Sequence, residues 1–294
     1  MGDSDKGSII SIDLGDWSKP ANTLIKKCDG ALGELFKPHQ IVRVAQAEVE
    51  ADKIRAVGQI EITDLQRRAV TRFVAEEAKK QQNIEAIMFK ALPGVSADAK
   101  PEEVEDDWIS NFFDKSRLIS DEEMQSLWAK ILAGEANTPG GFSKRTVNLV
   151  ASLDKSDAAL FSSLCSFVFY INGAHYPVVL DCQDQIYQRA GLPFPRLAHL
   201  ESAGLIHFSV IPRFTLTDLG QNTPLHLADQ RLVVRFPGEY PPYKLDFGEV
   251  VLTRAGLELG HLSGAQPTEG LLDYVKGYWG RSGLQIEGAA SAAE

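Results

Sequence analysis

The sequence lacks the features that mark several large classes of protein. Its 294 residues include three cysteines, Cys28, Cys165 and Cys182, at scattered spacings. This fits a reducing compartment better than a disulfide framework. No apolar run approaches the roughly 18 residues that mark a transmembrane helix. The N-terminus also lacks the basic start and apolar core of a secretory signal. We therefore expect a cytoplasmic protein.

An excess of positive charge is also missing. The formal net charge is −10, and residues 181–294 hold 9 basic and 13 acidic side chains. Proteins that bind nucleic acid gather lysine and arginine to neutralise phosphates. The charge balance therefore weighs against DNA as a partner.

Catalytic signatures are missing as well, including the nucleophile elbow, the P-loop, the dinucleotide-binding glycine motif and paired Cys-x-x-Cys or His-Glu-x-x-His. The histidines do not fall at metal-ligand spacing: His39, His175, His199, His207, His226 and His261. We expect no catalytic residue, no metal and no cofactor. Cys165 lies in the apolar run LFSSLCSFVF and is expected to be a buried thiol. Because triads assemble in space, an enzyme with an unrecognised site stays open.

The first structured segment predicted is an amphipathic helix over residues 18–37, after a flexible stretch over residues 1–17. Its apolar stripe and flanking lysines allow two partners, an anionic membrane surface or a protein face. Packing on protein is favoured because Gly30 and Gly33 weaken a free helix. The residues expected to make either contact are Leu24, Lys26, Lys27, Leu32, Leu35 and Phe36.

Residues 38–92 are almost continuously helical in pattern, with alternating charges around a thin apolar seam. The seam consists of Ile54, Val57, Leu65, Ala69 and Phe73. A lone helix cannot bury such a seam, so it needs a partner helix or a second copy of the chain. The sequence therefore predicts a helical stalk and association region over residues 18–92, and a homo-oligomer.

A turn containing two prolines separates this region from a helical bundle predicted over residues 93–170. Trp128 shares a helical face with Met124, Ile131 and Leu132, so we expect it in the core. Asp121 and the two glutamates after it favour the start of that helix.

A glycine-rich turn within the bundle precedes Ser143, Lys144 and Arg145. Ser143 is a candidate N-cap, and free N–H groups beside two cations could hold an anion. A capped helical hairpin without a ligand is the favoured interpretation. Contact with an anionic partner through these three residues is the alternative.

Residues 171–283 shift to shorter elements with more proline and aromatic residues. A short helix ending in LESAGLI, a β-rich stretch and a later VLTRAGLEL are typical of a winged-helix domain. Arg196 and His199 are the polar residues on its expected recognition face, where Glu201 would repel phosphates. Residues 284–294 are predicted to be disordered. The expected fold is mainly α, with N-terminal amphipathic and long helices, a central bundle and a C-terminal winged-helix-like α+β domain.

Residues 106–168 carry a family resemblance. The shared pattern is a helix with Leu127, Trp128 and Ala129, a turn, and a helix ending in Leu153 before Asp157, Ala158 and Leu160. The run resembles the bacterial family catalogued as domain of unknown function 2806 and, more loosely, the abortive-infection alpha proteins. The first resemblance covers most of the chain and implies no activity. The looser one implies a role in bacterial defence against phage.

Together these patterns predict a non-enzymatic sensor or adaptor in antiphage defence. It would contact a second defence protein or a phage component, and an anionic membrane surface is a further candidate contact. A winged-helix transcriptional regulator that binds DNA is the main alternative.

Overall fold

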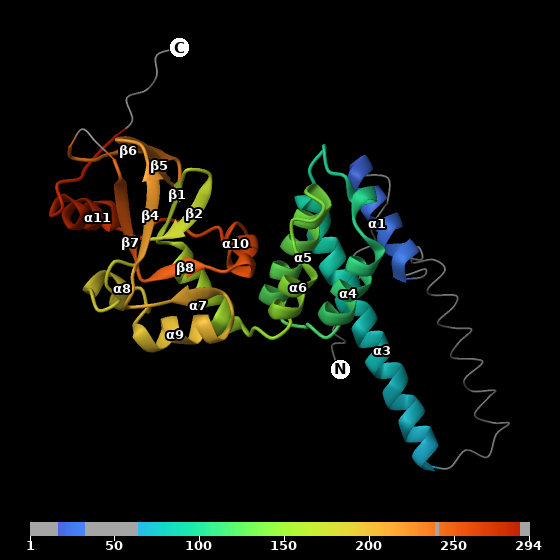
Figure 1. The fold of residues 1–294 in the computed structure, drawn as a ribbon. Coiled ribbons are helices and arrows are strands. Elements are labelled where there is room, and N and C mark those ends of the chain that lie inside the picture. Colours follow the sequence, from blue (N-terminus) through green and yellow to red (C-terminus); the bar gives the residue numbers. More distant parts are fainter. Residues whose placement is uncertain (1–16, 33–63, 239–240, 289–294) are drawn as a thin grey trace, which may run out of the picture. The chain divides into compact units, whose positions relative to one another are not determined.

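The computed structural model describes residues 17–32, 64–238 and 241–288 (Figure 1). The chain divides into two compact units, Met1–Lys144 and Arg145–Glu294. The described part is mixed α and β. It is mainly helical, and its strands all lie in the C-terminal unit.

The N-terminal unit is helical throughout its described residues. Its elements are α1 (Lys19–Leu32), α3 (Asp64–Ala91), the short 3-10 helices η1 (Leu92–Gly94) and η2 (Pro101–Glu103), α4 (Asp106–Ser116) and α5 (Glu122–Asn137). Helix α1 packs on α4 and η2, while α3 packs on α5. Asp121 caps α5 by accepting hydrogen bonds from the backbone N–H groups of Glu123 and Met124, which satisfies donors that the first turn leaves free.

The core of this unit is a set of rings that we call the closed aromatic cluster: Trp108, Phe112, Phe113 and Trp128. The Phe112 ring lies 5.1 Å from the Trp128 ring in an edge-on arrangement, and Trp108 stacks on Phe112 at the same distance. All four side chains are buried. The prediction that Trp128 lies in the core with its helical neighbours is confirmed.

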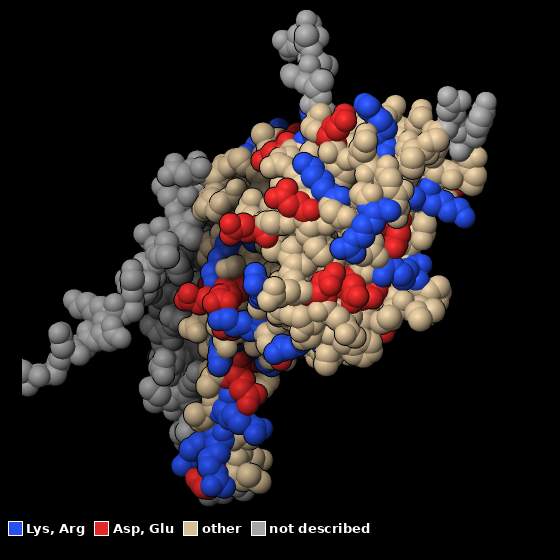
Figure 2. Space-filling view, turned by 90° about the vertical axis from the view of Figure 1, so that its left-hand side faces the viewer, with Lys and Arg blue, Asp and Glu red and all other residues tan. Residues whose placement is uncertain are grey.

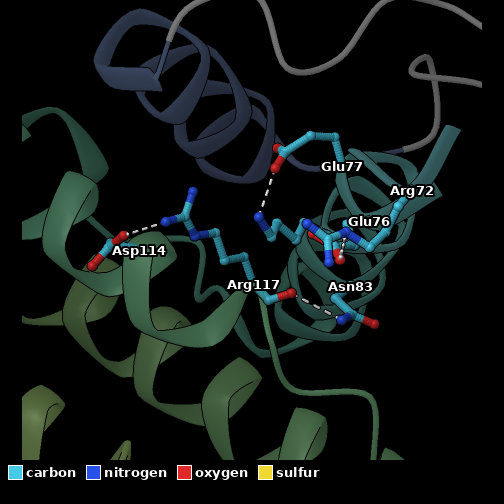
Figure 3. Close-up of polar contacts among 7 residues, drawn as sticks. Arg72, Glu76, Glu77, Asn83, Asp114 and Arg117 are labelled. Atoms are coloured by element: carbon cyan, nitrogen blue, oxygen red, sulfur yellow. Dashed lines mark hydrogen bonds and ion pairs between the residues drawn. The ribbon is translucent and has the colours of Figure 1, made fainter. Parts of the chain in front are cut away.

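Helix α3 has two unlike halves. Its last turns are buried on the bundle from Asn83 onward, whereas residues 64–73 are exposed on every side. The Asn83 side-chain amide marks the transition by donating to the Arg117 carbonyl at 2.9 Å, and the Arg117 guanidinium pairs with Asp114 at 2.8 Å (Figure 3). The expected long helix over residues 38–92 is described only from Asp64, so Ile54 and Val57 lie outside the described residues.

The C-terminal unit combines helices with antiparallel strands. Helix α6 (Lys144–Val150) begins at the boundary, and the helices that follow are α7 (Lys155–Cys165), α8 (Gln185–Arg189), α9 (Phe194–Ser202), α10 (Arg254–Gly260) and α11 (Leu271–Gly280). The strands are β1 (Val168–Ile171), β2 (Ala174–Pro177), β3 (Ile206–Phe208), β4 (Phe214–Leu219), β5 (Asn222–Leu227), β6 (Gln230–Arg235), β7 (Tyr243–Gly248), β8 (Val250–Leu252) and β9 (Gln285–Gly288). Five strands form a sheet in the order β2-β1-β5-β6-β9, while β3 pairs with β8 and β4 with β7.

Alternation along the strands separates the two faces of the five-stranded sheet. Phe169 and Ile171 of β1 are fully buried, whereas Tyr170 between them is 39% exposed. Leu225 and Leu227 of β5 and Leu232 of β6 continue the buried face. Successive strand side chains point to opposite faces, so the residues between these positions form the outer face.

Two segments differ from the prediction, one in the unit to which it belongs and one in its secondary structure. Helices α6 and α7, expected in a bundle ending at residue 170, fall in the C-terminal unit apart from Lys144. Residues 284–294 are predicted to be disordered, yet Gln285–Gly288 form β9, in which Ile286 pairs with Val234 of β6. The hydrogen-bonding partner of β9 is a distant strand, which local sequence does not reveal. Among the described helices, none is long and apolar enough to cross a bilayer.

Candidate functional site

The glycine-rich turn before α6 holds an anion, but that anion is part of the chain. The buried carboxylate of Glu135 accepts hydrogen bonds from the Gly140 N–H at 2.7 Å and the Phe142 N–H at 2.8 Å. Gly140 has a φ of +81°, a conformation that glycine adopts readily. The Phe142 carbonyl in turn accepts the Trp108 indole N–H at 2.7 Å. The turn therefore braces the closed aromatic cluster.

The three residues predicted to contact an anionic partner, Ser143, Lys144 and Arg145, differ in their surroundings. Helix α6 begins directly after Ser143 and is only seven residues long. The Lys144 ammonium lies 3.7 Å from a carboxylate oxygen of Asp107, in an exposed pair that contributes little free energy. Arg145 is exposed and belongs to the other unit.

The amphipathic stripe of α1 is covered by its own unit where it is described. Leu24 and Ile25 are buried, and Leu32 is half-buried. The Lys27 ammonium pairs with Asp106 of α4 at 2.7 Å, whereas Lys26 is exposed. Leu35 and Phe36, also expected on this stripe, lie outside the described residues.

Helix α9 carries the two residues expected to read a nucleic acid. Arg196 is exposed, but the His199 imidazole lies 2.6 Å from the Asp157 carboxylate of α7. Glu201 follows on the same helix and accepts the Phe208 N–H at 2.9 Å. At the N-terminal end of α9, Phe194 is 51% exposed and contacts Phe208 edge-on. This face is therefore apolar and acidic, with a single arginine.

One group of potential metal ligands occurs among the described residues: Asp181, Cys182 and Glu249, whose donor atoms lie within 4.8 Å of one another. Burial and the neighbouring Glu249 carboxylate raise the pKa of the Cys182 thiol to about 12. The Cys182 N–H also donates to Glu249 at 3.0 Å. A cysteine binds metal as its thiolate, and the raised pKa of Cys182 disfavours that form here.

The position of Glu249 depends on the glycine before it. Gly248 has a φ of +110°, and a Cβ there would lie 1.9 Å from the Val179 carbonyl oxygen. The Glu249 N–H donates to that same oxygen at 2.8 Å. The close approach of two chain segments holds Glu249 over Cys182.

The outer face of the five-stranded sheet carries a feature that we call the histidine cavity, with a volume of about 230 Å³. Strand register sets His175 of β2 and His226 of β5 on either side of Tyr170 of β1. Their rings lie 5.0 Å and 5.8 Å from the Tyr170 ring. His261, just after α10, meets His175 edge-on at 4.6 Å. Half of the six histidines in the sequence thus meet at one cavity.

Cys165 also lines this cavity and is buried, as predicted. Burial raises the pKa of its thiol to about 11, against a smaller opposing effect of the Ser263 side chain. The thiolate is the nucleophilic form of cysteine. Cys165 is therefore poorly suited to nucleophilic catalysis at neutral pH.

Sequence reasoning missed the histidine cavity because it tested histidine spacing along the chain only for metal ligands. One local signal was present. Asn172 and Gly173 form the two-residue turn between β1 and β2, with positive φ angles of 47° and 86°. An Asn-Gly pair between strands is a strong hairpin signal, and it places Tyr170 opposite His175.

These arrangements define an α+β protein with a helical N-terminal unit and a cavity on the sheet of its C-terminal unit. The chain belongs to the family described as protein of unknown function DUF2806, which it matches over residues 67–276. This confirms the first resemblance, and no comparison supports the looser one to the abortive-infection alpha proteins. Searches of curated proteins and of solved structures returned no match.

Proposed function

We propose that this protein is a non-enzymatic sensor or adaptor that associates with itself through α3 and presents its C-terminal unit to a protein partner. The proposed setting is bacterial defence against phage, with a second defence protein or a phage component as that partner. This setting depends on the looser resemblance alone. The exposed first half of α3 is the observation that carries the molecular part of the proposal.

The exposed half of α3 carries an apolar stripe of the kind that packs against a second helix. In the described part of the chain, Leu65 is 68% exposed and Phe73 is 62% exposed. These two residues and Ala69 are spaced four apart, so they share one helical face. Burying such side chains against a second copy contributes about 25 cal/mol per Å² of apolar surface.

The charges of α3 favour an antiparallel second copy as the occupant of that face. Arg68 and Arg72 precede Glu76 along the helix, and Figure 2 shows basic side chains toward the N-terminal end of α3. In an antiparallel pair centred near Phe73, Glu76 of one copy lies between Arg68 and Arg72 of the other. The intrahelical pairs Arg72–Glu76 at 3.4 Å and Arg68–Asp64 at 3.8 Å are exposed, so they contribute little and exchange readily.

For the C-terminal unit we propose a winged-helix arrangement of α7, α8, α9, β3 and β8. Three observations support it: α8 and α9 are joined by a short turn, α7 packs on α9 through Asp157 and His199, and β3 pairs with β8 antiparallel. Strands β4 to β7 would then replace a short wing between β3 and β8.

A protein partner suits this unit better than DNA. The expected recognition helix begins at the exposed Phe194 and carries Arg196 and the acidic Glu201. Ile211, after β3, is a further exposed apolar residue of this unit. The face of the unit seen in Figure 2 carries both signs of charge. Phosphate binding requires a concentration of basic side chains. The DNA-binding alternative therefore ranks second.

The proposal is tested by the mass of the full chain in solution. By light scattering at micromolar concentration, we expect the wild type to be a dimer or larger. Leu65→Glu combined with Phe73→Glu should give a monomer, because charges on the shared face cannot be buried unpaired. Leu118→Glu is the matched control, since Leu118 is 66% exposed in the same unit but outside α3. A monomeric wild type would contradict self-association.

The cellular setting has its own test. Cells producing the wild type should form fewer phage plaques than cells producing the Leu65→Glu, Phe73→Glu variant. Equal plaque numbers across a panel of phages would contradict the proposed role in defence. They would not affect the conclusion on self-association, which depends on light scattering.

A further inference from the structure

We propose that the histidine cavity binds a planar, uncharged heteroaromatic ring, and that its ligand class is the base of a nucleoside. This site goes beyond the proposed function, because neither self-association nor a protein partner requires it. The inference depends on where the rings lie, which side chains line the cavity and how large it is.

The rings of this cavity do not serve the core of the sheet. On β1 the core is filled by Phe169 and Ile171, both fully buried, while Tyr170 points to the opposite face and is 39% exposed. His175 and His226 flank it on the neighbouring strands at the same register. An exposed aromatic ring between two imidazoles is a ready stacking platform for a ligand ring.

The lining selects against charged ligands. Among the described residues around the cavity, none is lysine, arginine, aspartate or glutamate. Burial and the neighbouring His261 hold the pKa of His175 below its ordinary value, so this imidazole is neutral at physiological pH. A neutral imidazole offers one hydrogen-bond donor and one acceptor. A phosphate or carboxylate would find no lysine or arginine among these lining residues.

Hydrogen-bonding groups also line the cavity. Ser166 and Ser263 lie there with His261, and their hydroxyl groups already donate to the carbonyls of Ser163 and Gly260, so they offer a base edge their acceptor oxygens. Nucleobases present donors and acceptors in one plane and stack on aromatic and histidine side chains when they are unpaired. The combination of aromatic rings with hydroxyl and imidazole groups fits this chemistry.

Size limits the ligand to one ring system. Pockets for drug-sized ligands span roughly 300–1,000 Å³, whereas this cavity measures about 230 Å³. A single base with part of its sugar fits that volume. A dinucleotide does not, and a nucleoside is therefore the right probe.

The test is calorimetric titration of the full chain at neutral pH with adenosine, guanosine, cytidine and uridine in turn. At least one nucleoside should bind at a single site. Tyr170→Leu should weaken that binding about fivefold or more, which is the lower end of the loss when a stacking ring is removed. Tyr170→Phe keeps the ring and should stay within about twofold of the wild type.

Two further variants separate a ligand contact from damage to the fold. His261→Ala should weaken binding, and it carries the test if Tyr170→Leu unfolds. His207→Ala is the matched control, because His207 is exposed on β3 and does not line the cavity. It should bind as the wild type does.

Three results would overturn the proposal. The first is no saturable binding of any of the four nucleosides at millimolar concentration. The second is unchanged affinity in both Tyr170→Leu and His261→Ala. The third is tighter binding of inorganic phosphate or Zn²⁺ than of every nucleoside, which would make this an anion or metal site.

Discussion

The two units each gather aromatic rings, but they use them differently. In the closed aromatic cluster, Phe112 and Trp128 are fully buried and their rings meet at 5.1 Å. In the histidine cavity, Tyr170 stays 39% exposed beside about 230 Å³ of space. Rings that fill their surroundings lower the free energy of the fold. Rings that surround a space keep contacts available for a ligand.

The difference arises from secondary structure. Helices α4 and α5 both pack on α3, and Phe112 of α4 meets Trp128 of α5, so these rings fill the space between helices. Strand β1 must send alternate side chains to the outer face of the sheet. There Tyr170 shares the cavity with His261 and residues after α10, and it stays 39% exposed. An outer face that is polar and only partly covered can bind a ligand.

The largest effect should come from the closed cluster. Trp128→Ala removes a fully buried indole and should lower the free energy of unfolding by about 3–5 kcal/mol, the usual range for a large aromatic. Chemical denaturation with a fluorescence or circular dichroism readout measures it. Trp128→Phe should cost clearly less, since much of the ring packing is kept. A loss near zero for Trp128→Ala would mean that the cluster is not close-packed.

The carboxylate that braces this cluster should give the next largest effect. Glu135→Ala leaves the buried Phe142 N–H without its acceptor, and an unsatisfied buried donor costs about 1–3 kcal/mol. As a control on the same turn, Lys144→Ala with Arg145→Ala should change stability by less than about 0.5 kcal/mol, since both side chains are exposed. If the double variant lost more stability than Glu135→Ala, the cations rather than Glu135 would organise the turn.

The smallest effect concerns the histidine cavity and depends on pH. The pKa of His175 is lowered in the folded state, by burial first and by repulsion from His261 second. The unfolded chain therefore binds the proton more readily between this lowered pKa and the ordinary value of 6.5. Stability should fall as pH falls through that window.

His175→Gln should make the unfolding midpoint less sensitive to pH in that window. Thermal unfolding of both proteins near neutral pH and near about pH 5 compares them. The groups that face His175 are Tyr170 on β1 and His261 after α10, and neither is acidic. An equal pH dependence in both proteins would show that His175 is not desolvated. It would also weaken the contrast between the closed aromatic cluster and the histidine cavity.

Much of the local structure could be predicted because it depends on neighbouring residues. The core position of Trp128 follows from helical spacing with Met124 and Ile131, and Asp121 marks the start of α5. The Asn172-Gly173 turn, although it was overlooked, encodes the pairing of Tyr170 with His175. The apolar face of α3 also follows from spacing alone, and the structure adds that its first half is exposed.

The candidate sites depended on contacts that no local pattern encodes. The glycine turn does suit an anion, but only the folded chain shows that Glu135 occupies it. His199 lies on an exposed helical face, but Asp157, 42 positions away, pairs with it. Likewise, β1 meets β5 and His261 meets His175 through tertiary contacts. Helix spacing, caps and tight turns arise from interactions within a few residues, so the sequence by itself determined them. Which distant groups share a cavity is decided by burial of the whole chain, and only the tertiary structure determined that.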